Sequence, residues 1–260
     1  MSDTPMMKQY QSIKSKYKDA ILFFRLGDFY EMFYDDAILA AKELSLTLTG
    51  RGKDESRVPM CGVPHHAAEN YIAKLVKKGF KVAICEQIEA ADESKGPTKR
   101  DVVRVITPGT AQLDPVLQDD QSNYLMAMHQ SGSDIGFAII DLSTGEFKCD
   151  VCNTLAKAIS EMHRIQVKEV LVSDAIFSKV NHPAKSSFFP VDQAQAESTI
   201  TGFFNIQSLS VFGIDHLSAS FCAIVAILDY VEYTQKSAMP QIQSCKPLKS
   251  AIYCVFDSNV

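Results

Sequence analysis

The chain has 260 residues, of which 46% are hydrophobic and 22% charged, a composition typical of globular proteins. At roughly 100–200 residues per domain, this length predicts two folded units. No apolar run approaches the about 18 residues that a membrane helix requires, and the first residues lack the basic flank and apolar stretch of a secretory signal. We therefore expect a cytoplasmic protein with no membrane contact.

Charge is distributed unevenly along the chain. The first 115 residues carry 17 Lys and Arg against 16 Asp and Glu, a net charge of +1, whereas the remainder carries 9 against 15, a net charge of -6. A domain that binds nucleic acid through phosphate contacts alone is usually more basic than either part. Charge alone therefore favours two ordinary solvated surfaces.

The first half of the chain has the pattern of a mixed α/β unit. Thr4 and Pro5 suit the N-cap and first position of a helix. Two prolines and a glycine in residues 58–66 predict an irregular, exposed connection there, and the charged residues 89–100 predict a hairpin or loop. Apolar periodicity predicts helices over residues 5–19, 37–44 and 67–78, and strands over residues 21–26, 81–88 and 102–106.

The second half has a different pattern, which begins after a polar segment at residues 110–121. Three strands joined by short Ser- and Gly-containing turns predict a meander, and helices and strands then alternate. This order is that of a ribonuclease H-like domain. The predicted strands are 124–128, 135–141, 146–152, 169–173 and one near 188–189, and the predicted helices are 155–165 and 217–233.

Four groups of residues allow a catalytic, metal-binding or phosphate-binding interpretation. Asp141 ends a central strand, where a ribonuclease H-like nuclease would hold a metal with carboxylates such as Glu146 and Asp174, but a capping role before a Ser-Thr-Gly turn explains it equally well. The pair Cys149 and Cys152 has no second pair to complete a metal site.

The remaining two candidates also lack a complete motif. His65 and His66 follow Cys61 without a partner cluster, so we favour a helix-terminal or surface role for them. The segment 50–53 has neither the spacing nor the hydroxyl of a phosphate-binding loop, so this chain by itself is not expected to hydrolyse ATP.

A mostly aromatic run after Gly27 and Asp28 is the most informative feature. Six such consecutive side chains cannot all point inward from one strand or helix, so we expect at least one bulky ring to be exposed. An exposed Phe at a turn is a candidate wedge between DNA base steps, and a nearby carboxylate is compatible with DNA only if it meets a base edge. The run comprises Phe29, Tyr30, Glu31, Met32, Phe33 and Tyr34.

Four segments of the first half carry a recognisable set of motifs: residues 27–37, 58–67, 83–87 and 103–110. In this order, they closely resemble the N-terminal mismatch-recognition domain of the bacterial MutS family. The segment 141–147 is similar to the connector domain of that family, which is ribonuclease H-like. The resemblance implies an α/β fold with a mixed-sheet mismatch-recognition domain at 1–113, a connector at 114–240 and the start of a truncated core or lever domain at 241–260.

By this resemblance, Phe29 matches the phenylalanine that stacks on a mispaired or unpaired base, and Glu31 matches the glutamate that hydrogen-bonds it. Arg51, together with Pro59, Met60 and Arg104, matches positions on the DNA-facing side of the family. Gly50 stands where many relatives carry a second basic residue, which weakens a phosphate clamp in that loop.

The resemblance further implies a chain that is not itself an enzyme and that initiates mismatch repair by kinking mismatched or looped duplex DNA. The connector is expected to contact the MutL partner. ATP and magnesium, and a homodimer, are expected for the full-length protein, because its ATPase and dimerisation regions lie outside this chain. Two alternatives remain: a metal-dependent nuclease that uses Asp141, and a pure protein-interaction module in which Phe29 belongs to the core.

Overall fold

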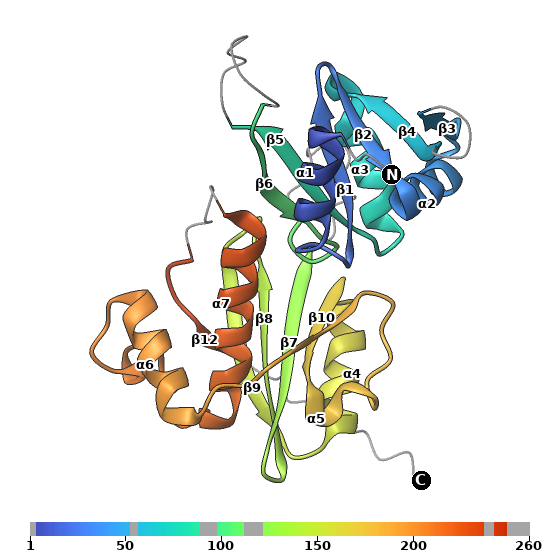
Figure 1. Cartoon of the computed structure of the whole chain (residues 1–260). Helices are drawn as coiled ribbons and strands as arrows, with labels where there is room; N and C mark the ends of the chain where they lie inside the picture. Colours follow the sequence, from blue (N-terminus) through green and yellow to red (C-terminus); the bar gives the residue numbers. More distant parts are fainter. Residues whose placement is uncertain (1–3, 53–56, 89–97, 112–121, 237–241, 249–260) are drawn as a thin grey trace, which may run out of the picture.

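The computed structural model describes residues 4–52, 57–88, 98–111, 122–236 and 242–248. They form two mixed six-stranded sheets, each with helices on both faces, joined end to end (Figure 1). The α/β fold class with two mixed sheets is thereby confirmed. The predicted hairpin or loop at 89–100 and the predicted boundary at 110–121 lie mostly outside the described residues.

The first sheet has the strand order β3-β4-β2-β1-β5-β6, in which β1 and β5 are parallel and the other neighbours antiparallel. Helix α1 covers one face, and α2 and α3 cover the other, so the sheet separates two apolar clusters. The helices are α1 (Pro5–Lys14), α2 (Tyr34–Leu44) and α3 (Ala68–Lys77), and the strands are β1 (Ala20–Leu26), β2 (Phe29–Phe33), β3 (Thr49–Arg51), β4 (Val58–Pro64), β5 (Lys81–Gln87) and β6 (Arg100–Ile106).

Helix α1 begins as predicted but is shorter. The Thr4 hydroxyl accepts a hydrogen bond from the Met7 amide, and Pro5 occupies the first position. The helix ends at Lys14 rather than near residue 19, and turns after it lead into β1. Asp36 of α2 is buried, accepts from the Leu22 amide at 2.9 Å and pairs with the Lys14 ammonium at 2.8 Å, so one carboxylate joins α1, α2 and β1.

The prediction of an irregular, exposed connection at 58–66 is wrong. Residues Val58–Pro64 form the inner strand β4, in which Cys61 and Val63 are buried. Both prolines lie at the ends of the ladder with β2: Pro64 pairs with Phe29, the first residue of β2, and Pro59 lies beyond the last pair, Phe33 with Met60. A missing amide hydrogen at those ends leaves the ladder between them intact.

The second sheet confirms the predicted meander and adds elements that were not predicted. Strands β7, β8 and β9 are antiparallel, and β10 and β11 extend the sheet in parallel. The strands are β7 (Tyr124–Ser131), β8 (Asp134–Asp141), β9 (Glu146–Cys152), β10 (Glu169–Ser173), β11 (Lys185–Phe188) and β12 (Lys246–Pro247), and the helices are α4 (Leu155–Ile165), α5 (Asp174–Phe177), α6 (Gln193–Phe204) and α7 (Phe221–Gln235).

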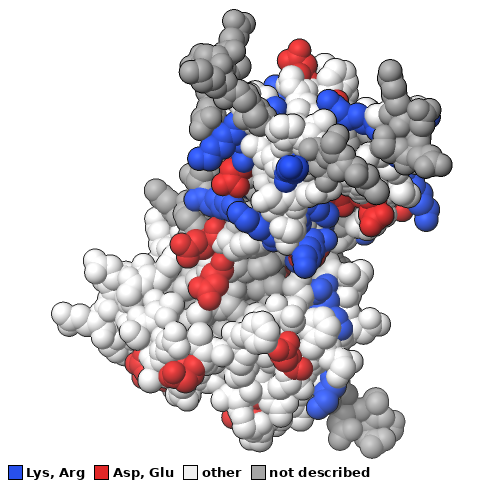
Figure 2. Space-filling model, in the orientation of Figure 1, with Lys and Arg blue, Asp and Glu red and all other residues white. Residues whose placement is uncertain are grey.

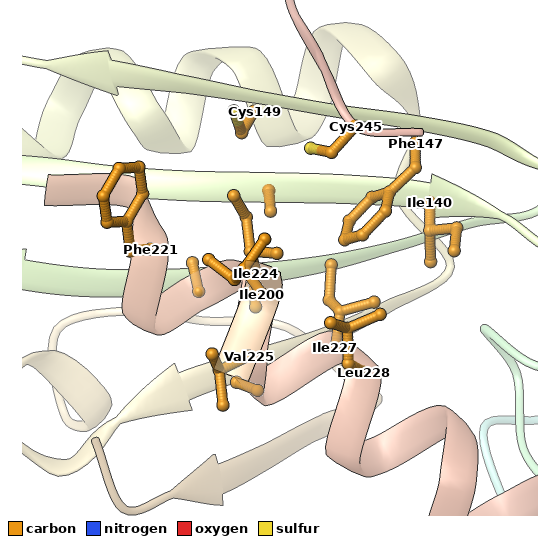
Figure 3. Close-up of a cluster of buried hydrophobic side chains, with 14 of the residues drawn as sticks. Ile140, Phe147, Cys149, Ile200, Phe221, Ile224, Val225, Ile227, Leu228 and Cys245 are labelled. Atoms are coloured by element: carbon orange, nitrogen blue, oxygen red, sulfur yellow. The ribbon is translucent and has the colours of Figure 1, made fainter. Parts of the chain in front are cut away.

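The cores of the second sheet lie on its two faces. Helices α6 and α7 pack on one face, where Ile224 and Ile227 of α7 meet Ile140 and Phe147 of the sheet (Figure 3). Helices α4 and α5 cover the other face. Residues 242–248 follow α7 and add β12 beside β9, so this segment is part of the second sheet, and residues 249–260 lie outside the described part.

Candidate nucleic-acid interface

The exposed aromatic ring expected in the run after Gly27 is that of Phe29. Gly27 has a φ of +58°, which lets the chain turn tightly between β1 and β2. The turn is fixed because the His65 amide donates to the Asp28 carbonyl at 2.8 Å and the Arg25 Nε donates to the Gly27 carbonyl at 2.5 Å. Phe29 follows directly and is 47% exposed.

The rings after Phe29 are held inside the domain. Tyr30 faces the α2 and α3 side, where its hydroxyl donates to the Glu86 carboxylate and its ring lies 5.4 Å from that of His65. Met32 and Phe33 are fully buried on opposite faces. The run is therefore a β-strand with one exposed end. The Glu86 carboxylate that accepts from Tyr30 lies 56 residues further along the chain, so no local pattern reveals this contact.

Glu31 lies two residues after Phe29 and therefore on the same face of β2. Its side chain is 21% exposed, and its Oε2 is 3.1 Å from the Arg51 Nη1. Burial raises the pKa of the Glu31 carboxyl, and the Arg51 guanidinium partly opposes this rise. The site thus places a partly buried acid beside an exposed aromatic ring.

Strand register divides the other predicted site residues between the two faces. Met60 pairs with Phe33, so it shares the face of Phe29 and Glu31, and it packs against the cluster under α1. Arg51 pairs with Val58 on that same face. Pro59 is one residue from Met60 and points to the opposite face.

Arg104 is separated from the group around Phe29. It pairs with Ile84, whose side chain belongs to the cluster under α2 and α3. Burial lowers the pKa of the Arg104 guanidinium, which the charge of Glu69 on α3 partly opposes, and its Nε has no hydrogen-bond partner among the described residues. The structure therefore brings together Phe29, Glu31, Arg51 and Met60, and leaves Arg104 on the other side of the sheet.

The residues considered for catalysis have structural partners. The Asp141 carboxylate is buried and accepts from the Ser143 amide at 2.9 Å, the Ser143 hydroxyl at 2.6 Å and the Asn123 amide at 3.1 Å, as its capping role predicts. Within the described ranges, no three His, Cys, Asp or Glu side chains are grouped so that they could hold a metal ion.

The reactive thiols and histidines also have structural surroundings. The side chains of Cys149 and Cys245 are buried together in the second core. His65 lies in a short 3-10 helix, 4.0 Å from the Glu86 carboxylate, and His66 follows it there.

Surface charge agrees with the division seen in the sequence. On the face drawn in Figure 2, Lys and Arg side chains gather mainly over the first domain and at its junction with the second. Among the described helices, none has the length and apolar character needed to span a membrane.

Comparison with known proteins identifies both domains. The family MutS domain I matches residues 4–114, and the family MutS domain II matches residues 123–243. The chain is 44% identical to the DNA mismatch repair protein MutS of Halothermothrix orenii, 42% to that of Symbiobacterium thermophilum and 39% to that of Lachnoclostridium phytofermentans. Each match covers 98% of this chain. The matched part makes up 30%, 31% and 29% of the length of these three relatives, respectively. The chain therefore belongs to the MutS family, of which it contains domains I and II.

Proposed function

We propose that this chain recognises mispaired or unpaired bases in duplex DNA and so initiates mismatch repair. Phe29 enters the base stack as a wedge and Glu31 meets the edge of the displaced base. The observation that carries the proposal is the exposed Phe29 ring on a fixed turn, with the Glu31 carboxyl on the same strand face. The names of the relatives point to the same process.

The selectivity of this mechanism comes from the DNA. Inserting an apolar side chain costs the free energy of unstacking a base step and yields a kink. This cost is smaller where pairing is already defective, so a mismatch is favoured without any reading of the surrounding sequence. A raised pKa suits Glu31 to the task, because a protonated carboxyl donates to a base nitrogen and does not repel the phosphates.

Arg51 and Met60 share the face of the wedge and are placed to contact the backbone or groove beside it. Pro59 and Arg104 remain predicted DNA contacts, and their position on the other face makes a direct contact with the same groove less favourable. The second domain contributes no charge attraction to DNA, so we assign it a protein-contact role toward MutL. We assign ATP and magnesium binding, and the homodimer, to the longer proteins of which this chain matches about 30%.

The test is equilibrium binding of one single-mismatch duplex and its matched control to this chain and to Phe29→Ala. Fluorescence anisotropy at one stated salt concentration, with protein up to about 10⁻⁴ M, covers the range of weak DNA binding. We expect the wild-type chain to prefer the mismatch and Phe29→Ala to lose that preference with an unchanged melting temperature. Phe189→Ala is the matched control, because Phe189 is 85% exposed on the second domain.

Two results would contradict the proposal. If Phe29→Ala lost stability by the about 3–5 kcal/mol of a buried Phe deletion, Phe29 would be a core residue and its effect on DNA secondary. If wild type and Phe29→Ala both bound the two duplexes alike, with Phe29→Ala stable, the protein-interaction interpretation would account better for this chain.

A further inference from the structure

A carboxylate with no exposed surface lies where the two domains meet. Glu169, the first residue of β10, is 0% exposed, although Glu is almost never fully buried unless it is paired. Its partners come from the second domain, from the first domain and from the segment that leaves the first sheet. This arrangement includes none of the residues of the Phe29 surface, which comprises Phe29, Glu31, Arg51 and Met60, and is not explained by DNA recognition.

One oxygen of Glu169 holds the segment that leaves β6. Oε2 accepts from the Thr107 hydroxyl at 2.5 Å and from the Gly109 amide at 3.0 Å. A Cβ atom at Gly109 would lie 2.9 Å from the Glu169 Cβ and 3.0 Å from the Leu125 Cβ, so a larger residue would displace this segment from the second sheet. The segment that leaves the first domain therefore packs directly on the second domain.

The other oxygen faces a lysine of the first domain. Oε1 accepts from the Tyr230 hydroxyl of α7 at 2.6 Å and lies 3.9 Å from the ammonium of Lys81, the first residue of β5. Lys81 also donates to the Ser186 hydroxyl of β11 at 2.7 Å and lies 5.3 Å from the centre of the Tyr230 ring. One cation of the first domain thus contacts three side chains of the second.

A second set of contacts lies beside the first, at the C-terminal end of α7. The Lys236 ammonium donates to the Val102 carbonyl at 3.0 Å and to the Tyr17 hydroxyl at 2.5 Å, and the Tyr17 ring stacks with that of Tyr233 at 6.0 Å. Figure 1 shows α7 and β7 reaching the lower edge of the first domain. The junction is therefore a packed surface rather than a bare linker.

Domains joined within one chain move relative to each other by default, unless their interface is large and hydrophobic. The contacts here are instead polar and specific: separating the two domains would break the pair of Glu169 with Lys81 and the hydrogen bonds that Thr107 and Gly109 donate to Glu169. We infer that Glu169, paired with Lys81, is a positioning residue that locks the two domains into one rigid body. The Phe29 surface is then held in a fixed orientation by a side chain of the second domain.

Residual dipolar couplings of the backbone amides test this inference, because they report the orientation of each domain in a weakly aligned sample. The proteins are the wild-type chain, Glu169→Gln and Lys81→Met. The matched control is Glu43→Gln, which removes an ion pair with Lys78, at 2.8 Å, inside the first domain. Couplings from each sheet are fitted separately to an alignment tensor.

We expect one common tensor for both sheets in the wild-type chain and in Glu43→Gln. In Glu169→Gln and in Lys81→Met we expect loss of the common tensor, with each sheet still fitting its own. Two different tensors in the wild-type chain, or a wild-type common tensor in a folded Glu169→Gln or in Lys81→Met, would overturn the inference. If Glu169→Gln fails to fold, Lys81→Met decides, because it changes the first-domain side of the pair and leaves Glu169 in place.

Discussion

At the scale of single residues, the candidate site depends on one strand that presents two kinds of side chain to one face. Phe29 is exposed because β2 begins at the tip of a turn, beyond the area that α1 covers. Glu31 is further along the strand and partly buried, and this burial raises the pKa of its carboxyl. Under the proposed function, the difference between these two environments suits Phe29 to stacking and Glu31 to hydrogen bonding.

The raised pKa of Glu31 has a consequence for stability. As the pH rises above the usual value of a glutamate, the unfolded chain loses this proton before the folded chain does. The free energy of unfolding therefore falls with pH across that window. Gln cannot titrate, so we expect Glu31→Gln to become more stable relative to wild type as the pH rises through it, as measured by urea unfolding at a series of pH values.

Glu43 provides a control because its pKa is shifted in the opposite direction to that of Glu31. The Lys78 ammonium donates to the Glu43 carboxylate and lowers its pKa, so the wild-type chain gains stability relative to Glu43→Gln as the pH rises. Equal pH dependence of Glu31→Gln and Glu43→Gln relative to wild type would show that folding lowers the pKa of Glu31, as it lowers that of Glu43, and does not raise it. The proposed donor role of Glu31 would then lose its basis.

At the scale of elements, local sequence patterns predicted most helices and strands but not those determined by tertiary contacts. Strand β4 was missed because its prolines indicate a loop, and only the strand pairing shows that both lie at the ends of the ladder with β2. Helix α6 was missed because its buried side is small, with Ala196 and Ile200 as its buried residues.

The same limit applies to the site. The exposure of Phe29 follows from the crowding of aromatic residues, whereas the contact of Glu86 with Tyr30 and the position of Arg104 depend on the order of strands in the sheet.

Helix α7 is the element on which the second core depends. Ile224 is 0% exposed and packs against the sheet among the side chains drawn in Figure 3. We expect Ile224→Ala to lower the free energy of unfolding by about 2–5 kcal/mol, because a buried side chain is lost and a cavity remains. Urea unfolding measures this change.

Val211 is the matched control for that experiment, since it lies in the same domain and is 68% exposed. A change within about 0.5 kcal/mol is expected for Val211→Ala. A similarly small change for Ile224→Ala would mean that α7 is not the main support of this sheet.

At the scale of the whole molecule, charge limits how the chain can hold DNA. The net charge is +1 through residue 115 and -6 beyond it, so under the proposed function the second domain would repel the duplex that the first domain contacts. Proteins that make six to ten phosphate contacts show slopes of about -5 to -9 when log affinity is plotted against log salt concentration. A wedge mechanism obtains its selectivity from base stacking and DNA deformation, terms that do not require counterion release.

We therefore expect the mismatch affinity of this chain to fall with salt along a slope shallower than about -5. The ratio between mismatched and matched duplex should stay nearly constant across the series, because Phe29 acts on stacking and not on phosphates. Anisotropy titrations of both duplexes at increasing salt measure the slope and the ratio together. A steep slope with a ratio that vanishes at high salt would instead identify phosphate contacts as the main source of affinity, and the preference for mismatches as a secondary effect of phosphate binding.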